Sequence, residues 1–229
     1  MLKIIDPTIQ DTFPIEINQF FADNKSFFWG YKSIDDISLS DEFLENAYQL
    51  YKNCGIIVYH YTREVAPGYF AKYGLRVLNF VEQKNFVINA LQNRLSLNEL
   101  GEIMKLDLPE GRSHDKNSIW FCYQRDDSSA GDLVKYFGGE CIYGQLTDGY
   151  TENTVSNTLK QIGNPVVVKF YCNAGDIKNY KVTEIMLATF LRKYCNNEFR
   201  IPTREDYIKK NIMPTQILGV YPVKTSPSF

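Results

Sequence analysis

The stretch Ile56-Ile57-Val58-Tyr59-His60-Tyr61 decides the fold, because it predicts a buried strand early in the chain. β-Branched and aromatic residues fill it, and these residue types are enriched in strands. Gly55 ends a helix that we expect to begin after the N-cap residue Ser40 and to run through Tyr51, with apolar residues at helical spacing. The sequence therefore predicts a helix that leads directly into a central strand.

The patterns on the C-terminal side of this strand alternate between helix and strand. Residues 65–73 predict a turn or short helix closed by Gly74, and residues 80–104 predict a helical block that Ser96 or Gly101 can divide. For residues 182–194 the spacing favours a helix over a strand. The remaining expectations are a short helix at 131–137, a connecting helix and loop at 147–164, and strands at 75–78, 118–123, 165–172 and 217–223.

Length and composition indicate a single soluble globular domain, which the predicted helices and strands make an α+β one. The chain has 229 residues, of which 44% are hydrophobic and 23% are charged, as in ordinary globular proteins. One hydrophobic core is the default for a mixed domain of this size. We expect residues 1–52 to form an N-terminal accessory lobe packed on the core, and residues 53–229 to form the main domain.

Charge, apolar runs and cysteine spacing limit the classes of function. The net charge of −2 provides no broad positive field for a phosphate backbone. No apolar run approaches the roughly 18 residues that cross a bilayer, and the N-terminus has no secretory signal pattern, so we expect a cytoplasmic protein without membrane contact. The five cysteines are widely spread and make no zinc pattern with the two histidines, so we expect free thiols and no metal.

Three segments of the chain resemble ADP-ribosyltransferases. Tyr59-His60-Tyr61-Thr62 and Gly74-Leu75 are similar to the early-strand signature of that superfamily and to the Gly-Leu pair downstream of it. Ser118-Ile119-Trp120-Phe121, followed by Tyr136, resembles the strand and helix of the histidine-tyrosine-glutamate subgroup. Residues 212–220 are similar to the closing strand of toxin-like members. The resemblance implies an α+β fold with a split mixed β-sheet core, flanking helices and an N-terminal helical extension.

The resemblance also implies that NAD⁺ is a co-substrate. It assigns His60 a hydrogen bond to the ribose beside nicotinamide, and Thr62 a supporting contact with the dinucleotide. Each candidate has a structural interpretation as well, because a histidine in an aromatic strand is commonly a packed residue. The other implied cofactor contacts come from Tyr61, Gly74 and Tyr136, of which Tyr136 would stack on nicotinamide, and Arg63 and Arg76 are candidates for the pyrophosphate.

Two glutamates compete for the catalytic place. The departure of nicotinamide leaves positive charge on the ribose, so the chemistry requires a carboxylate near the 2′-hydroxyl. Glu184 lies between the strongest predicted strand and the last one, which is the usual place of the family's glutamate. Glu140 follows a Gly-Gly turn, in a position similar to that of RES-type NAD-degrading toxins. Both glutamates remain candidates for the catalytic carboxylate, and we rank Glu140 first.

The expected function is transfer of ADP-ribose from NAD⁺ to a macromolecule, which is a protein, DNA or RNA. By analogy such an enzyme acts as a bacterial toxin, with an antitoxin protein as a further partner, or in phage defence. Hydrolysis of NAD⁺ by water and a non-catalytic binding module are the alternatives. Most rival enzyme classes lose support, because the chain has no Walker, Rossmann, nucleophile-elbow or His-Glu-x-x-His motif.

Overall fold

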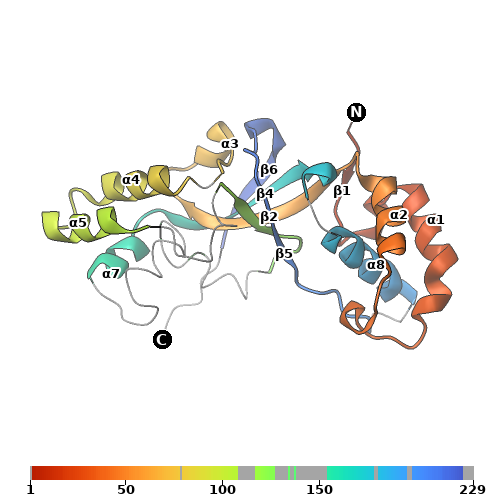
Figure 1. The fold of residues 1–229 in the computed structure, drawn as a ribbon. Coiled ribbons are helices and arrows are strands. Elements are labelled where there is room, and N and C mark those ends of the chain that lie inside the picture. Colours follow the sequence, from red (N-terminus) through yellow and green to blue (C-terminus); the bar gives the residue numbers. More distant parts are fainter. Residues whose placement is uncertain are drawn as a thin grey trace. The chain divides into compact units, whose positions relative to one another are not determined.

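A computed structural model describes residues 2–77, 79–107, 117–126, 134, 137, 154–177, 180–194 and 198–223 (Figure 1). Within these ranges the fold is mixed α+β, with seven α-helices and a six-stranded sheet that is not closed, which confirms the predicted class. The chain divides into two compact units. Unit 1 contains residues 1–59, 121–125 and 170–207, and unit 2 contains residues 60–120, 126–169 and 208–229. The proposed division at residue 52 stays a prediction.

The sheet has β2 as its middle strand. Its order is β5-β3-β2-β4-β6, and β1 pairs with β2 in addition. Strand β1 runs parallel to β2, with Ile4 opposite Gly55, whereas β3 is antiparallel to β2, with Tyr59 opposite Cys122. The predicted central position of residues 56–61 is therefore confirmed. The strands are β1 (Ile4–Ile5), β2 (Gly55–Glu64), β3 (Ile119–Cys122), β4 (Asn164–Asn173), β5 (Glu205–Ile208) and β6 (Ile217–Pro222).

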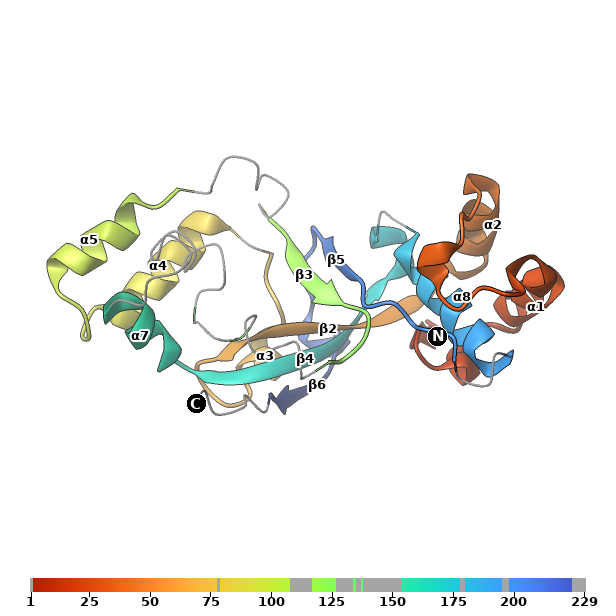
Figure 2. The same cartoon turned by 90° about the horizontal axis from the view of Figure 1, so that it is seen from below.

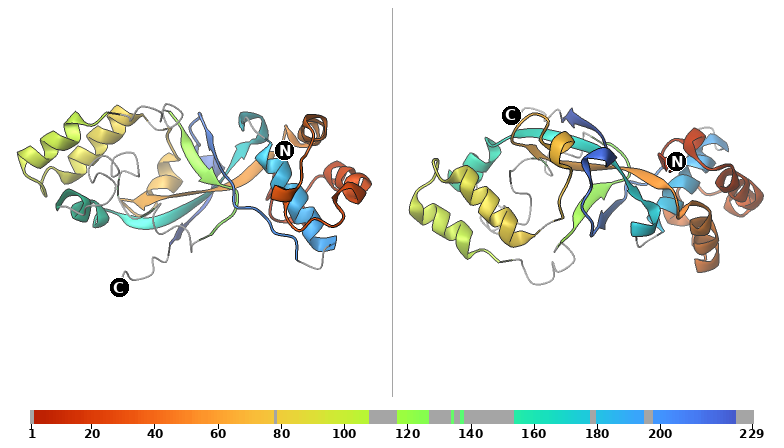
Figure 3. Two further views of the ribbon diagram at one scale, coloured as in Figure 1. Left: turned by 60° about the horizontal axis from the view of Figure 1, so that its bottom comes forward. Right: turned by 90° about the horizontal axis from the view of Figure 1, so that it is seen from above.

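Unit 1 gathers three helices, α1 (Ile15–Asn24), α2 (Asp41–Tyr51) and α8 (Lys181–Tyr194), which lie together in both views of Figure 3. The Ser40 hydroxyl accepts the Phe43 N–H and so begins α2, as the sequence predicts. Helix α8 is buried over most of its length, and the Phe190 ring lies 5.6 Å from that of Phe21. The helical interpretation of residues 182–194 is confirmed.

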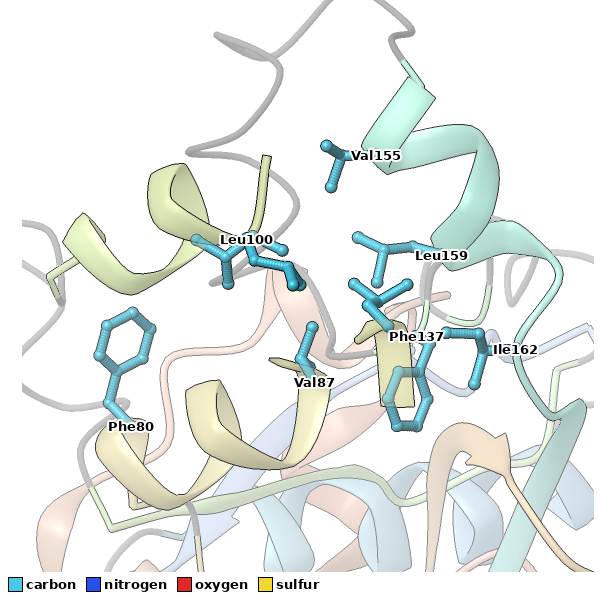
Figure 4. Close-up of a cluster of buried hydrophobic side chains, with 9 residues drawn as sticks. Phe80, Val87, Leu100, Phe137, Val155, Leu159 and Ile162 are labelled. Carbon is cyan, nitrogen blue, oxygen red and sulfur yellow. The ribbon is translucent and has the colours of Figure 1, made fainter. Parts of the chain in front are cut away.

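Unit 2 has its own helical cluster of α4 (Phe80–Leu91), α5 (Leu97–Lys105) and α7 (Thr154–Lys160), which lie near one another in Figure 2. Ser96 divides the predicted helical block, because its side chain and that of Glu99 form a capping box at the start of α5. Gly101 lies inside α5 and does not divide it. The buried cluster consists of Phe80, Val87, Leu91, Leu100, Ile103, Phe137, Val155, Leu159 and Ile162 (Figure 4).

Gly74 ends the short helix α3 (Tyr69–Tyr73) in the left-handed region, with φ +71°. Leu75 and Ile212 then exchange two backbone hydrogen bonds of 2.9 and 2.8 Å, which make a single isolated bridge. The predicted strand at 75–78 is therefore wrong for its described residues. The pairing stops because the Val77 N–H donates to the side-chain oxygen of Asn211 at 2.9 Å instead of continuing a ladder.

Candidate functional site

His60 is fixed on β2 by the neighbouring strand. Its Nδ1 lies 2.7 Å from the backbone oxygen of Trp120 on β3, and both residues belong to unit 2. A carbonyl oxygen only accepts, so Nδ1 carries the proton and Nε2 of the neutral ring keeps its lone pair. Burial lowers the pKa of His60, and the hydrogen bond to Trp120 opposes this shift in part. The imidazole is therefore a neutral, oriented acceptor at neutral pH.

Alternate residues of β2 place different chemistry on its two faces. Thr62 and Glu64 follow His60 at the two-residue period of a strand, so these three side chains share a face. Tyr61 points to the opposite face, where its hydroxyl accepts the backbone N–H of Asp126 at 2.7 Å. The phenol of Tyr61 thus holds a loop in place, and its role in a cofactor site stays a prediction.

Arg63, also on the opposite face, binds backbone rather than a free anion. Its guanidinium donates to four carbonyl oxygens, those of Val134, Lys160, Ile162 and Gly163, at 2.7 to 2.8 Å. These oxygens belong to the end of α7, the turn after it, and Val134. A contact between Arg63 and a pyrophosphate would break these bonds, so the structure gives Arg63 a local structural role.

Gly74 brings two segments of the resemblance together. A Cβ atom built on it would lie 1.9 Å from the backbone oxygen of Ile212. Gly74-Leu75 and the segment that leads into β6 therefore lie in direct backbone contact within unit 2. The close approach explains why this position requires glycine, independently of any role of Gly74 in holding NAD⁺.

Glu184 lies on α8 in unit 1, where it forms an ion pair. Its Oε2 accepts from Nε of Arg204 at 3.1 Å, and the same guanidinium also pairs with Asp35. Its side chain is 29% exposed, so solvent reaches it in part. His60, Thr62 and Gly74 belong to unit 2, and the catalytic role of Glu184 stays a prediction. Glu140 and Tyr136, the other predicted site residues, lie outside the described residues.

Glu64 is a further candidate residue, beyond those that the resemblance implies. It lines a cavity of about 660 Å³ in unit 2, and only 9% of its surface is exposed. The two-residue period of a strand could have predicted this position. Alternate residues share a face, so Glu64 follows His60 and Thr62 on the same face of β2.

The described ranges contain no group of three or more histidine, cysteine or acidic side chains placed to hold a metal ion. In the same ranges, every helix is too short or too polar to cross a membrane. Comparison with models of protein families, with curated proteins and with solved structures gave no significant match.

Proposed function

We propose that this chain binds NAD⁺ and transfers its ADP-ribose to a macromolecule. The observation that carries the proposal is the orientation of His60 by the Trp120 carbonyl. With Nδ1–H donated to the backbone, Nε2 can accept a hydrogen bond from a ribose hydroxyl, which is the role that the resemblance implies. Thr62, on the same face of β2, supplies a hydroxyl for a second contact.

The proposed reaction breaks the bond between the ribose C1′ and the nicotinamide nitrogen. The electron pair leaves with nicotinamide, and the ribose develops oxocarbenium character that a carboxylate stabilises. A nucleophile of the acceptor then bonds to C1′ and loses its proton. Glu140 and Glu184 remain the candidates for the carboxylate, and the role of the protein as a toxin or phage-defence effector, with or without an antitoxin, belongs to the proposal.

The test is incubation of the pure protein with labelled NAD⁺ and cell lysate, followed by sorting of the label into protein, DNA, RNA and free ADP-ribose. We expect Glu140→Gln or Glu184→Gln to reduce NAD⁺ consumption by about 10²- to 10³-fold, because each would remove a transition-state charge. Glu82→Gln, at an exposed position of α4, is the matched control and should keep full activity. Absence of NAD⁺ consumption by the wild type would refute the proposal.

Glu184→Gln needs a stability measurement beside the activity. The substitution weakens the ion pair with Arg204, so a lost activity has two explanations unless the melting temperature is unchanged. Arg204→Gln separates them, because it removes the ion pair with Glu184, along with the one to Asp35, and leaves the Glu184 carboxylate. If Glu184 is catalytic, Glu184→Gln is inactive and Arg204→Gln retains activity at a temperature where both variants are folded.

The ion pair of Glu184 also favours one alternative function, a binding module without turnover. A carboxylate neutralised by a guanidinium stabilises positive charge less well than a carboxylate alone. Calorimetry, together with an assay of NAD⁺ turnover, distinguishes the binding module from the transferase. Binding of NAD⁺ with no turnover, unchanged in both glutamate variants and lost in His60→Ala, would support the binding module, whereas free ADP-ribose without labelled polymer would support NAD⁺ hydrolysis.

A further inference from the structure

A cavity of about 660 Å³ opens in unit 2 beside the C-terminal end of β2. Its walls come from four segments: the end of β2 with the following turn, α3, the start of β4, and β6. The lining is largely apolar, and among the described residues that form it only Glu64 is charged. The lining residues are Glu64, Gly68, Ala71, 164–166, 217–220 and Pro222.

Glu64 is more than nine-tenths buried, yet its carboxylate is weakly satisfied. Its Oε1 accepts the Phe70 N–H at 3.4 Å, which is long for a hydrogen bond. Among the described residues, no lysine or arginine forms an ion pair with it. Within the described part of the chain the other carboxylate oxygen has no hydrogen-bond partner and is not sealed from the surface, so it can accept from a ligand in the cavity.

The charge of the lining selects the class of ligand. The described lining contains no cation that could hold a phosphate, and the Glu64 carboxylate repels one. NAD⁺ itself and a nucleic-acid backbone are therefore poor occupants. A lysine or arginine side chain fits, because its methylene stem can lie along Ala71, Val166 and Val220 while its charged end meets Glu64. The volume exceeds that of one side chain and suits a short peptide segment.

We propose that this cavity binds a lysine- or arginine-bearing segment of a partner protein, with Glu64 as the counter-ion. Glu64 is four residues from His60 on the same face of β2, which separates their Cα atoms by about 13 Å. A segment in the cavity therefore lies beside the proposed NAD⁺ site within unit 2. This step rests on the proposed function: if the chain transfers ADP-ribose, the acceptor is a protein that docks through a basic residue.

Binding is tested on the full chain without NAD⁺. The probes are fluorescein-labelled pentapeptides with arginine or lysine at the centre and valine or alanine on both sides, and matched peptides in which uncharged citrulline replaces arginine. Fluorescence anisotropy should show binding of the arginine or lysine peptides to the wild type. We expect a loss of about tenfold to hundredfold with citrulline and with Glu64→Gln, because each removes one charge of the pair.

A stability measurement on Glu64→Gln and two further variants, Ala71→Phe and Glu82→Gln, distinguish loss of binding from loss of folding. Glu64→Gln keeps a carbonyl oxygen for the Phe70 N–H, and its melting temperature should stay near that of the wild type. Ala71→Phe, at an exposed position of α3, adds bulk to the cavity lining while it keeps the Glu64 side chain itself, and should also abolish binding. Glu82→Gln should bind as the wild type does. Equal affinity of Glu64→Gln and wild type, no binding by the wild type, or displacement of the peptide by a single-stranded thymidine oligonucleotide would each overturn the proposal.

The outcomes separate this inference from the proposed function. Peptide binding through Glu64 in a protein that consumes no NAD⁺ supports the cavity and refutes the transferase. Consumption of NAD⁺ with label on DNA or RNA and none on protein supports the transferase and overturns the protein acceptor. If protein is labelled, and Glu64→Gln reduces the labelling by raising KM for the acceptor protein at unchanged kcat, both the transferase and the peptide-binding cavity are supported.

Discussion

His60 donates its Nδ1–H to the backbone oxygen of Trp120 on the adjacent strand, over 2.7 Å. This contact joins two segments that lie sixty residues apart in the chain and selects one tautomer of the ring. Nε2 is therefore the nitrogen of this imidazole that can accept a hydrogen bond. The burial of the ring also makes its protonation unfavourable.

The stability of the protein should fall on acidification through His60. Burial lowers the pKa of His60 below its ordinary value of 6.5, so below that pH the unfolded chain takes up a proton that the folded chain does not. The free energy of unfolding therefore decreases as pH falls through about 6.5, by up to about 1.4 kcal/mol for each unit of difference in pKa. Urea unfolding at about pH 7.5 and about pH 5.5 should show a larger acid loss in wild type than in His60→Gln. Equal losses would contradict the prediction.

Gly74→Ala should destabilise the protein strongly. The left-handed φ of +71° and the Ile212 oxygen 1.9 Å from the new Cβ both oppose the substitution, and we expect a loss of about 3 kcal/mol or more. Gly68→Ala is the matched control, since Gly68 has φ +81° but open space around its Cβ position. That variant should lose only about 1 kcal/mol, and equal melting temperatures of the two variants would rule out the steric explanation.

Arg63→Lys should lower stability although it keeps the charge. A lysine ammonium cannot reach four carbonyl oxygens in the planar arrangement that the guanidinium of Arg63 occupies. We expect a loss of about 2 to 4 kcal/mol in denaturant unfolding, because four partly buried carbonyls lose their donors. Arg94→Lys, at an exposed position after α4, should change stability by less than about 0.5 kcal/mol. An unchanged free energy of unfolding in Arg63→Lys would show that water replaces the lost donors.

Leu159→Ala should open a cavity in the helical cluster of unit 2. Leu159 is fully buried among residues of α4, α5 and α7, and we expect a loss of about 3 kcal/mol. Leu97→Ala provides the comparison, because Leu97 begins α5 and is 88% exposed. Thermal unfolding should leave Leu97→Ala close to wild type. A similar small effect of Leu159→Ala would mean that the cluster relaxes to fill the space.

Local signals explain which elements the sequence predicted well. The caps at Ser40 and Ser96 act through side-chain bonds to residues three positions away, so they operate before any tertiary contact forms. Strands β2 and β4 are apolar over most of their length, and their residue types favour strands in almost any context. The order of these elements, and with it the α+β class, follows from the chain alone.

Strand β5 shows what local signals miss. Of its four residues Glu205–Ile208, the first two carry charged side chains, so no apolar alternation predicts a strand. In the fold Asp206 is 3% exposed and accepts a hydrogen bond of 2.8 Å from the hydroxyl of Tyr123. The burial of this carboxylate depends on a partner more than eighty residues away, and no propensity contains that information.

The same distinction applies to the candidate site. The residue types and the two-residue period of β2 establish that His60, Thr62 and Glu64 share a face, because strand geometry leaves no other choice. Three other features depend on contacts distant in the chain: the Trp120 carbonyl beside His60, the four carbonyls around Arg63, and the Arg204 guanidinium beside Glu184. Such contacts form only when the fold brings separate segments together, so they set the chemistry of side chains whose identity and register were already readable in the sequence.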